Sequence, residues 1–212
     1  MSPHPEAHQA VLEQVQLYGL TTVAAAARVA TNGDRAAATK LLDALVRDGA
    51  LFRYRTLYTS GQPAPKPRDR WRDLAVLSYC CLGNRERPRI AKDRLIEVLS
   101  GLAERLGVRP QTDKPCIFDR DDRLTRLWVE PYSTADAGME LGAVLEALQR
   151  AASNPSFELW SYLALSGQFS LLILCRNRQR AKELGRWLVR VPLVGRAGAE
   201  NVEIATSTAV IQ

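Results

Sequence analysis

The chain has 212 residues, 46% hydrophobic and 25% charged, which is enough for one large or two small domains with buried cores. This composition excludes a disordered chain, and no apolar run is long enough to span a bilayer, so we expect no membrane contact. The net charge of +6 and the isoelectric point near 9.4 favour a polyanionic partner, and the lack of a secretory signal pattern at the start predicts a cytoplasmic protein.

Three helices are predicted at the start of the chain. The first covers residues 8–18 and the second residues 21–28, where threonines can cap it. A tight turn follows, in which Gly33 tolerates a left-handed backbone and Asp34 can cap the third helix, predicted over residues 35–47. The apolar residues of this third helix form one stripe, so its polar face can lie in a groove of DNA.

The sequence after the third helix predicts a wing. Gly49 is typical of a helix end, and residues 50–58, ALFRYRTLY, alternate in the manner of a strand. On these residues, and most closely on VRDGALFRYRTLY, the chain resembles winged helix-turn-helix DNA-binding domains over roughly residues 7–60. The alternative is a small helical domain that contacts proteins.

The predicted interface with double-stranded DNA combines the turn, the third helix and the basic residues after it. Arg35, Thr39 and Lys40 are expected to reach base edges, and the basic residues of the wing are expected to contact phosphates. A solvated charged face is the alternative for the basic cluster, which also includes Arg70 and Arg72. The predicted DNA-binding residues are Thr31, Asn32, Arg35, Thr39, Lys40, Arg47, Arg53, Arg55, Lys66 and Arg68.

A Pro-rich polar segment, residues 59–70, predicts an extended linker or the far end of the wing. We therefore expect a DNA-binding domain over residues 1–62, a linker over residues 63–72 and a second domain over residues 73–212.

The second domain alternates helical and strand patterns, which predicts an α/β fold. Its run FSLLILC has the length and continuous apolarity of a strand buried on both faces. Residues 157–165 fit a helix or a strand equally well. Helices are predicted over residues 71–82, 90–106, 139–152 and 178–191, and strands over residues 116–118, 124–130, 169–175 and 202–211. The second of these helices is expected to bury Leu95, Val98, Leu99 and Leu102.

This order of elements resembles the restriction-endonuclease-like fold, and the whole chain is similar to the replication-relaxation family of plasmids and other mobile elements. In that family a Pro-Asp pair begins one strand, and a Glu of the next strand is followed two residues later by Asp or Lys. Here Glu130 matches, whereas Cys116 and Tyr132 replace the other two residues. A magnesium-dependent nuclease needs at least two carboxylates at its metal. The departure therefore implies a catalytically inactive domain that serves in dimerisation or partner contact.

Neither metal nor cofactor chemistry is expected. Cys80, Cys81, Cys116 and Cys175 form no CxxC pair and lie in apolar stretches, which predicts buried free thiols. The only histidines lie within the first eight residues, and no glycine-rich phosphate loop is present. We therefore predict no catalytic residue, no metal site and no cofactor.

Five basic residues follow the buried apolar run of the second domain. They can extend the DNA footprint, meet an acidic partner or form a solvated helix face. These residues are Arg176, Arg178, Arg180, Lys182 and Arg186.

Taken together, these patterns predict a non-enzymatic, sequence-selective DNA-binding protein. Similarity to the replication-relaxation family implies an accessory role in plasmid transfer, relaxosome assembly or replication, with a relaxase or another mobile-element protein as partner. A homodimer is expected, since such modules usually bind two-fold sites. The alternatives are a transcriptional repressor of a mobile element and a divergent magnesium-dependent nuclease that uses Glu130 with Asp119.

Overall fold

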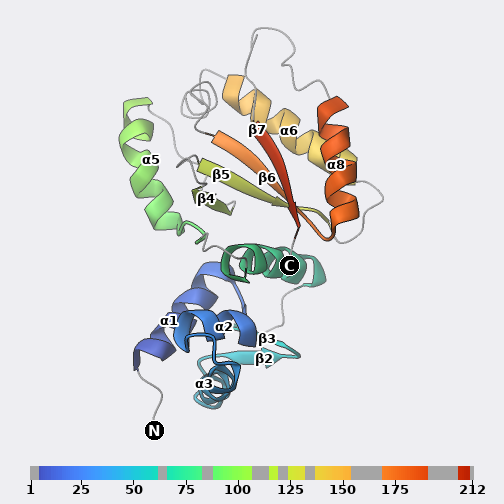
Figure 1. The fold of residues 1–212 in the computed structure, drawn as a ribbon. Helices are drawn as coiled ribbons and strands as arrows, with labels where there is room; N and C mark the ends of the chain where they lie inside the picture. Colours follow the sequence, from blue (N-terminus) through green and yellow to red (C-terminus); the bar gives the residue numbers. More distant parts are fainter. Residues whose placement is uncertain are drawn as a thin grey trace. The chain divides into compact units, whose positions relative to one another are not determined.

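The computed structural model describes residues 5–61, 66–82, 88–106, 115–118, 124–131, 137–153, 169–190 and 205–210 (Figure 1). It contains helices and two small sheets, which confirms a mixed α/β protein. The chain divides into two compact units, unit 1 with residues 1–88 and unit 2 with residues 89–211. Among the helices in these ranges, none combines the length and apolarity needed to cross a membrane.

Three helices open unit 1 close to the predicted places, although the second begins two residues later than predicted. Between the second and the third, Asn32 and Gly33 have φ angles of 50° and 89°, so the tight turn uses the left-handed backbone expected there. The Asp34 carboxylate then accepts hydrogen bonds from the backbone N–H groups of Ala36 and Ala37, at 2.8 and 3.0 Å, and caps the third helix. The helices are α1 (Pro5–Tyr18), α2 (Val23–Ala30) and α3 (Arg35–Arg47).

A three-stranded antiparallel sheet completes this part of unit 1, in the order β1-β3-β2. Its strands are β1 (Thr21–Thr22), β2 (Phe52–Tyr54) and β3 (Leu57–Thr59). The prediction of one strand over residues 50–58 was wrong, because the chain reverses at Arg55, whose φ is 55°. Tight hairpin turns usually carry Gly or Asn, and their absence here hid the turn.

Unit 1 also contains α4 (Pro67–Leu77), which continues as a π-helical turn, η1 (Ser78–Leu82). The predicted extended linker was therefore wrong from residue 67 onward. Pro67 starts this helix, where the missing N–H of proline costs no intrahelical hydrogen bond. Since α4 contacts α1 and η1 contacts α2, unit 1 continues past the predicted end of the first domain at residue 62.

The core of unit 1 is formed by the inward faces of the helices. The stripe predicted for α3 is buried, and Tyr58 of β3 is the largest fully buried side chain of this unit. The cluster comprises Val11, Val15, Ala26, Ala27, Ala38, Leu41, Leu42, Leu45, Leu51 and Tyr58. Burial of this stripe fixes which face of α3 points outward.

Unit 2 is built on a four-stranded sheet in the order β4-β5-β6-β7 (Figure 1). The first two strands form the predicted antiparallel hairpin, and β6 pairs in parallel with β5 and with β7. Residues 171–175 of β6 are all buried, which confirms the strand predicted to be covered on both faces. The strands are β4 (Cys116–Phe118), β5 (Leu124–Val129), β6 (Phe169–Cys175) and β7 (Ala205–Val210).

Three helices pack on this sheet, close to the predicted positions: α5 (Lys92–Leu106), α6 (Ala137–Ser153) and α8 (Arg178–Arg190). Leu95 and Leu99 of α5 are buried as predicted, but Val98 is 43% exposed. Among the described side chains of α5, the buried ones are thus four residues apart. The side chain of Leu102 and residues 157–165 lie outside the described part of the chain.

Candidate nucleic-acid interface

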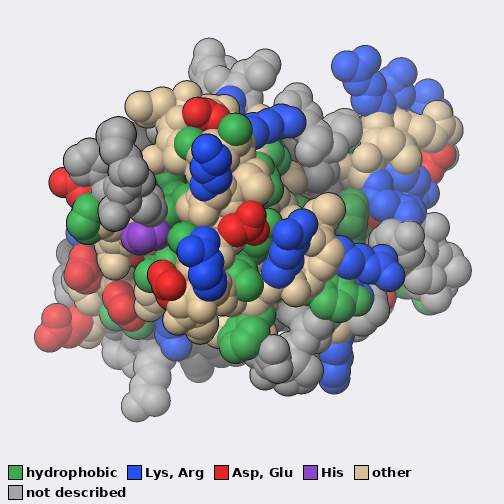
Figure 2. Space-filling view, turned by 90° about the horizontal axis from the view of Figure 1, so that it is seen from below, with side chains coloured by type: hydrophobic (Ala, Val, Ile, Leu, Met, Phe, Trp, Pro, Cys, Tyr) green, Lys and Arg blue, Asp and Glu red, His purple; other side chains and the backbone are tan. Residues whose placement is uncertain are grey.

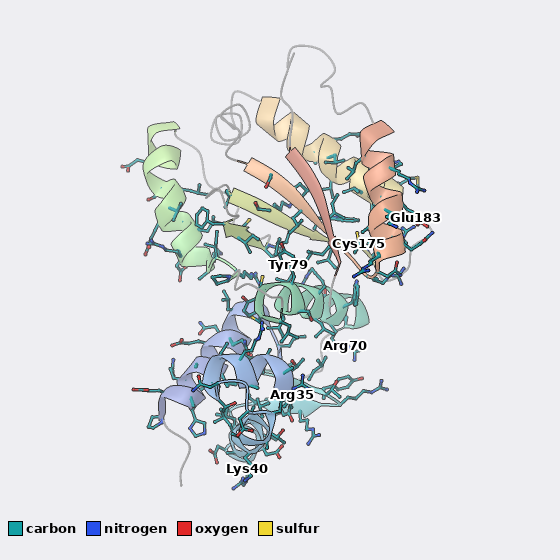
Figure 3. The ribbon with its side chains drawn as sticks, viewed as in Figure 1. Arg35, Lys40, Arg70, Tyr79, Cys175 and Glu183 are labelled. Atoms are coloured by element: carbon teal, nitrogen blue, oxygen red, sulfur yellow. The ribbon has the colours of Figure 1, made fainter. Side chains whose placement is uncertain are left out.

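The outward face of α3 is basic. Arg35, Lys40 and Arg47 are exposed, and Lys40 projects away from the helix (Figure 3). In the described ranges, no ion pair joins any of these three side chains to a carboxylate. Their charges are therefore available to a partner.

The hydroxyl groups of the turn before α3 and of the N-terminal half of α3 form hydrogen bonds with the nearby backbone. The Thr31 hydroxyl donates to the Asp34 carbonyl oxygen at 2.6 Å, and the Thr39 hydroxyl donates to the Arg35 carbonyl oxygen at 2.8 Å. Each hydroxyl proton is thus used within the protein, while the oxygen can still accept. The exposed Asn32 lies at the tip of the turn.

The β2–β3 hairpin carries two arginines beside α3. The Arg53 guanidinium lies 3.7 Å from the Asp43 carboxylate and 5.8 Å from the centre of the Tyr58 ring. Arg55, at the turn, lies 5.9 Å from the centre of the Tyr54 ring. An exposed ion pair of this kind stabilises little. The pair matters because the positive charge of Arg53 offsets the negative charge of Asp43, the only acidic residue of α3.

Two of the basic residues in α4 are engaged within unit 1. The Arg70 guanidinium lies 4.7 Å from the centre of the Tyr54 ring, so it joins α4 to the hairpin by a cation–π contact. Arg72 pairs with Asp69 at 3.6 Å and with Asp73 at 3.1 Å. The contact made by Tyr54 with Arg70 was not predicted, although the place of Tyr54 between arginines in the run RYR was a signal.

The last two predicted DNA-binding residues, Lys66 and Arg68, lie at the start of α4. Lys66 is exposed directly before α4, whereas the side chain of Arg68 lies outside the described part of the chain.

Residues 28–72 carry ten Lys and Arg against four Asp and Glu, while residues 5–27 carry two Glu and neither Lys nor Arg. Figure 2 shows basic side chains in the middle of the view and acidic ones at its left edge. Unit 1 therefore has a charge asymmetry along its sequence.

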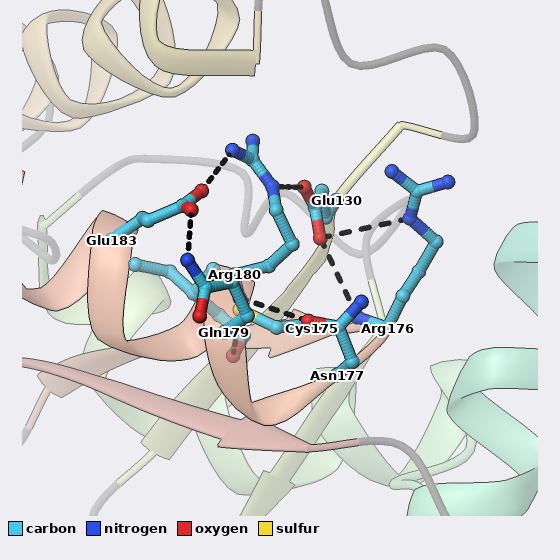
Figure 4. A network of polar contacts seen from close by, with 8 residues as sticks. Glu130, Cys175, Arg176, Asn177, Gln179, Arg180 and Glu183 are labelled. Carbon is cyan, nitrogen blue, oxygen red and sulfur yellow. Dashed lines mark hydrogen bonds and ion pairs between the residues drawn. The ribbon is translucent and has the colours of Figure 1, made fainter.

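A second polar site lies in unit 2, where the parallel strands β5 and β6 end (Figure 4). The Glu130 side chain is fully buried, and its carboxylate accepts hydrogen bonds from Arg180 Nε at 2.5 Å and from the backbone N–H of Arg176 at 3.4 Å. The Asn177 side chain caps α8 through the backbone N–H of Arg180. The bond to Glu130 raises the pKa of Arg180 above its usual value. Hydrogen bonds from Gln179 and then Arg180 lower the pKa of Glu183.

This geometry bears on the nuclease alternative. Arg180 and the backbone of Arg176 already hold the Glu130 carboxylate, where a metal ion would have to bind. Asp119, the second carboxylate of that hypothesis, lies outside the described residues. Within the described ranges, no three His, Cys, Asp or Glu side chains are grouped to hold a metal ion.

Cys80, Cys116 and Cys175 are buried free thiols, as predicted, whereas Cys81 is only half-buried. Burial, reinforced by the charge of Glu130, raises the pKa of the Cys175 thiol from 9.0 to about 12. The native thiol therefore keeps its proton at a pH at which the unfolded chain loses it.

This difference predicts that Cys175 lowers the stability of unit 2 as the pH rises from 9 towards 12. Below pH 9 both states are protonated, so the thiol adds no pH dependence. Urea unfolding of the wild type and of Cys175→Ala, compared at several pH values, measures the effect. The alanine variant should show a shallower loss of stability above pH 9, and Cys81→Ala should match the wild type. Parallel curves for all three proteins would contradict the assignment.

The observed fold and sites define a two-unit α/β protein whose first unit carries a basic helix-and-hairpin surface. Comparisons with protein-family models, curated proteins and solved structures found no match. The resemblances to winged-helix domains, to the restriction-endonuclease-like fold and to the replication-relaxation family stay predictions. Functional proposals therefore rest on the geometry and charge of this chain.

Proposed function

We propose that unit 1 is a winged helix-turn-helix that binds double-stranded DNA in a sequence-selective manner, without catalysing a reaction on it. The order of elements supports the proposal: α2, a tight turn and α3 are followed by a hairpin, and β1 pairs with β3 of that hairpin. The observation that carries it is the outward face of α3, whose exposed basic side chains have no carboxylate partner in the described ranges.

The dimensions and chemistry of α3 fit the major groove. A helix with its side chains is about 10–12 Å wide, and the major groove of B-DNA is about 12 Å wide. Arg35 and Lys40 lie in the N-terminal half of α3, the part of a recognition helix that usually reaches base edges. Both can donate hydrogen bonds to the O6 and N7 acceptors of guanine.

Phosphate contacts from the hairpin and from the start of α4 would fix the position of α3 in the groove. Arg53 and Arg55 are exposed cations of the hairpin and Lys66 is an exposed cation directly before α4, and such residues suit phosphate oxygens. The contact of Arg53 with Asp43 matters here, because an uncompensated carboxylate on α3 would repel the DNA backbone. The contact between Arg70 and Tyr54 joins α4 to the same hairpin.

Selection from a library of random-sequence DNA duplexes, with the full-length protein, tests this function. We expect a shared sequence motif to be enriched, and the affinity for that motif to fall steeply as salt is raised, because phosphate contacts release counterions. Retention that ignores salt and enriches no motif would move unit 1 to the class of protein-contact modules. Magnesium-dependent cutting of the selected duplex, lost in Glu130→Ala, would overturn the non-catalytic part of the proposal.

A further inference from the structure

The charges around α8 do not balance locally. The carboxylates of Glu130 and Glu183 both contact Arg180, and Glu130 also lies 4.0 Å from Arg176 Nε (Figure 4). In the described ranges, no ion pair joins Arg178, Lys182 or Arg186 to a carboxylate, although the charge of Arg186 contributes to lowering the pKa of Glu183. The five basic residues that look alike in sequence thus fall into a paired set and a set of three without ion pairs.

These three residues form one ridge on the helix. Arg178, Lys182 and Arg186 are spaced four residues apart, which places each about 6 Å further along the same face of an α-helix. All three are exposed, while Leu184 and Leu188 bury the opposite face of α8. We call these three residues the α8 ridge.

The α8 ridge is unfavourable for the isolated protein. Like charges four residues apart repel one another along a helix. Arg178 is also the first residue of α8, where the helix dipole disfavours a cation. An anion with several charges would remove both penalties at once.

The surroundings of the ridge favour nucleic acid over a protein partner. Protein interfaces usually combine arginine anchors with tryptophan or tyrosine side chains that are buried on binding. The large hydrophobic residues that are exposed in the described part of unit 2 lie on α5, β4 and α6, and none lies on α8. Interfaces with DNA are more polar and more positively charged, as this ridge is.

We infer that the α8 ridge is a second DNA-binding surface, which contacts backbone phosphates without reading sequence. The inference rests on the proposed function in one respect, that the polyanion is the same double-stranded DNA. Since phosphate contacts are independent of sequence, the ridge should raise affinity equally for the selected motif and for unrelated duplexes.

The test compares two variants of the full-length protein with equal loss of charge. Arg178→Gln with Lys182→Gln removes two cations of the ridge, and Lys92→Gln with Arg94→Gln removes two exposed cations of α5. Binding to a fluorescent duplex of mixed sequence is measured across a salt series. The ridge variant should lower the slope of log affinity against log salt by about 1.8, since each phosphate contact contributes about 0.9. When salt is raised from 50 to 200 mM, the affinity of the wild type should therefore fall by a factor about 12 times larger than the affinity of the ridge variant.

The α5 variant should keep the wild-type slope. Equal slopes for the wild type and the ridge variant would overturn the inference, and so would an equal decrease in both variants, which would point to net charge alone. The proposed function can fail separately. If no motif is enriched but the ridge variant lowers the salt slope, the ridge stands without sequence-selective binding by unit 1. If a motif is enriched and the ridge variant leaves the slope unchanged, only the ridge is rejected.

Discussion

Glu130→Ala is expected to destabilise unit 2 by about 1–3 kcal/mol, the usual cost of removing a buried hydrogen-bond acceptor from its donors. The carboxylate is fully buried and accepts hydrogen bonds from Arg180 and from the backbone of Arg176. Its removal leaves Arg180 without its buried partner and the N–H of Arg176 without this acceptor. Urea unfolding followed by tryptophan fluorescence can measure the change, because Trp128 and Trp187 belong to unit 2.

Two further variants separate charge pairing from a general loss of packing. Glu183→Ala removes the more exposed partner of Arg180 and should cost much less, because a solvent-exposed ion pair is screened and stabilises little. Glu130→Leu combined with Arg180→Met replaces the pair by apolar side chains and should recover much of the lost stability. If Glu130→Ala unfolds at the same urea concentration as Glu183→Ala, the structural role assigned to Glu130 is wrong.

The same experiment distinguishes a structural carboxylate from a metal ligand. A metal ion that binds only the folded protein stabilises it by an amount that grows with the logarithm of the metal concentration above the dissociation constant. We expect the unfolding midpoint of the wild type to be the same with and without magnesium. A shift with magnesium that disappears in Glu130→Gln would instead favour the nuclease alternative.

Local signals made the first three helices of unit 1 predictable from the sequence. The turn residues Gly33 and Asp34 fix the start of α3, and their chemistry acts within a few residues of the chain. The hairpin turn at Arg55 was missed, because a non-glycine residue with positive φ has no sequence signature. Likewise α4 was hidden by the Pro-rich composition around Pro67, although a proline at the start of a helix is favourable.

The contacts at the polar sites could not be predicted, because they join residues that are far apart in the sequence. Glu130 and Arg180 are 50 residues apart, and nothing in the sequence near either residue indicates the other. The buried strand β6 was predictable from its apolar run. The contact between Glu130 and Arg176, which follows this strand, was not predictable. The contact between Arg53 and Asp43 is similar, since it depends on where the hairpin folds back beside α3.

Reversing two charges on α3, Arg35→Glu with Lys40→Glu, should lower the affinity for the selected DNA motif by roughly 30-fold to more than 10,000-fold. Each good contact to a base edge contributes about 1–3 kcal/mol, so two lost contacts cost about 2–6 kcal/mol. Both side chains are exposed and lack an ion pair in the described ranges, so the fold should tolerate the change. A glutamate at position 35 even suits the first turn of α3, where the helix dipole favours anions.

The control reverses an equal number of exposed charges in unit 2, with Lys92→Glu and Arg94→Glu on α5. It reproduces the change in net charge and should reduce affinity modestly and by the same factor for every duplex. The α3 variant should differ in kind, because it should lose the preference for the selected motif over unrelated duplexes. Thermal unfolding close to that of the wild type must accompany this loss. An α3 variant that keeps its preference would mean that Arg35 and Lys40 do not read bases, and that the recognition surface lies elsewhere.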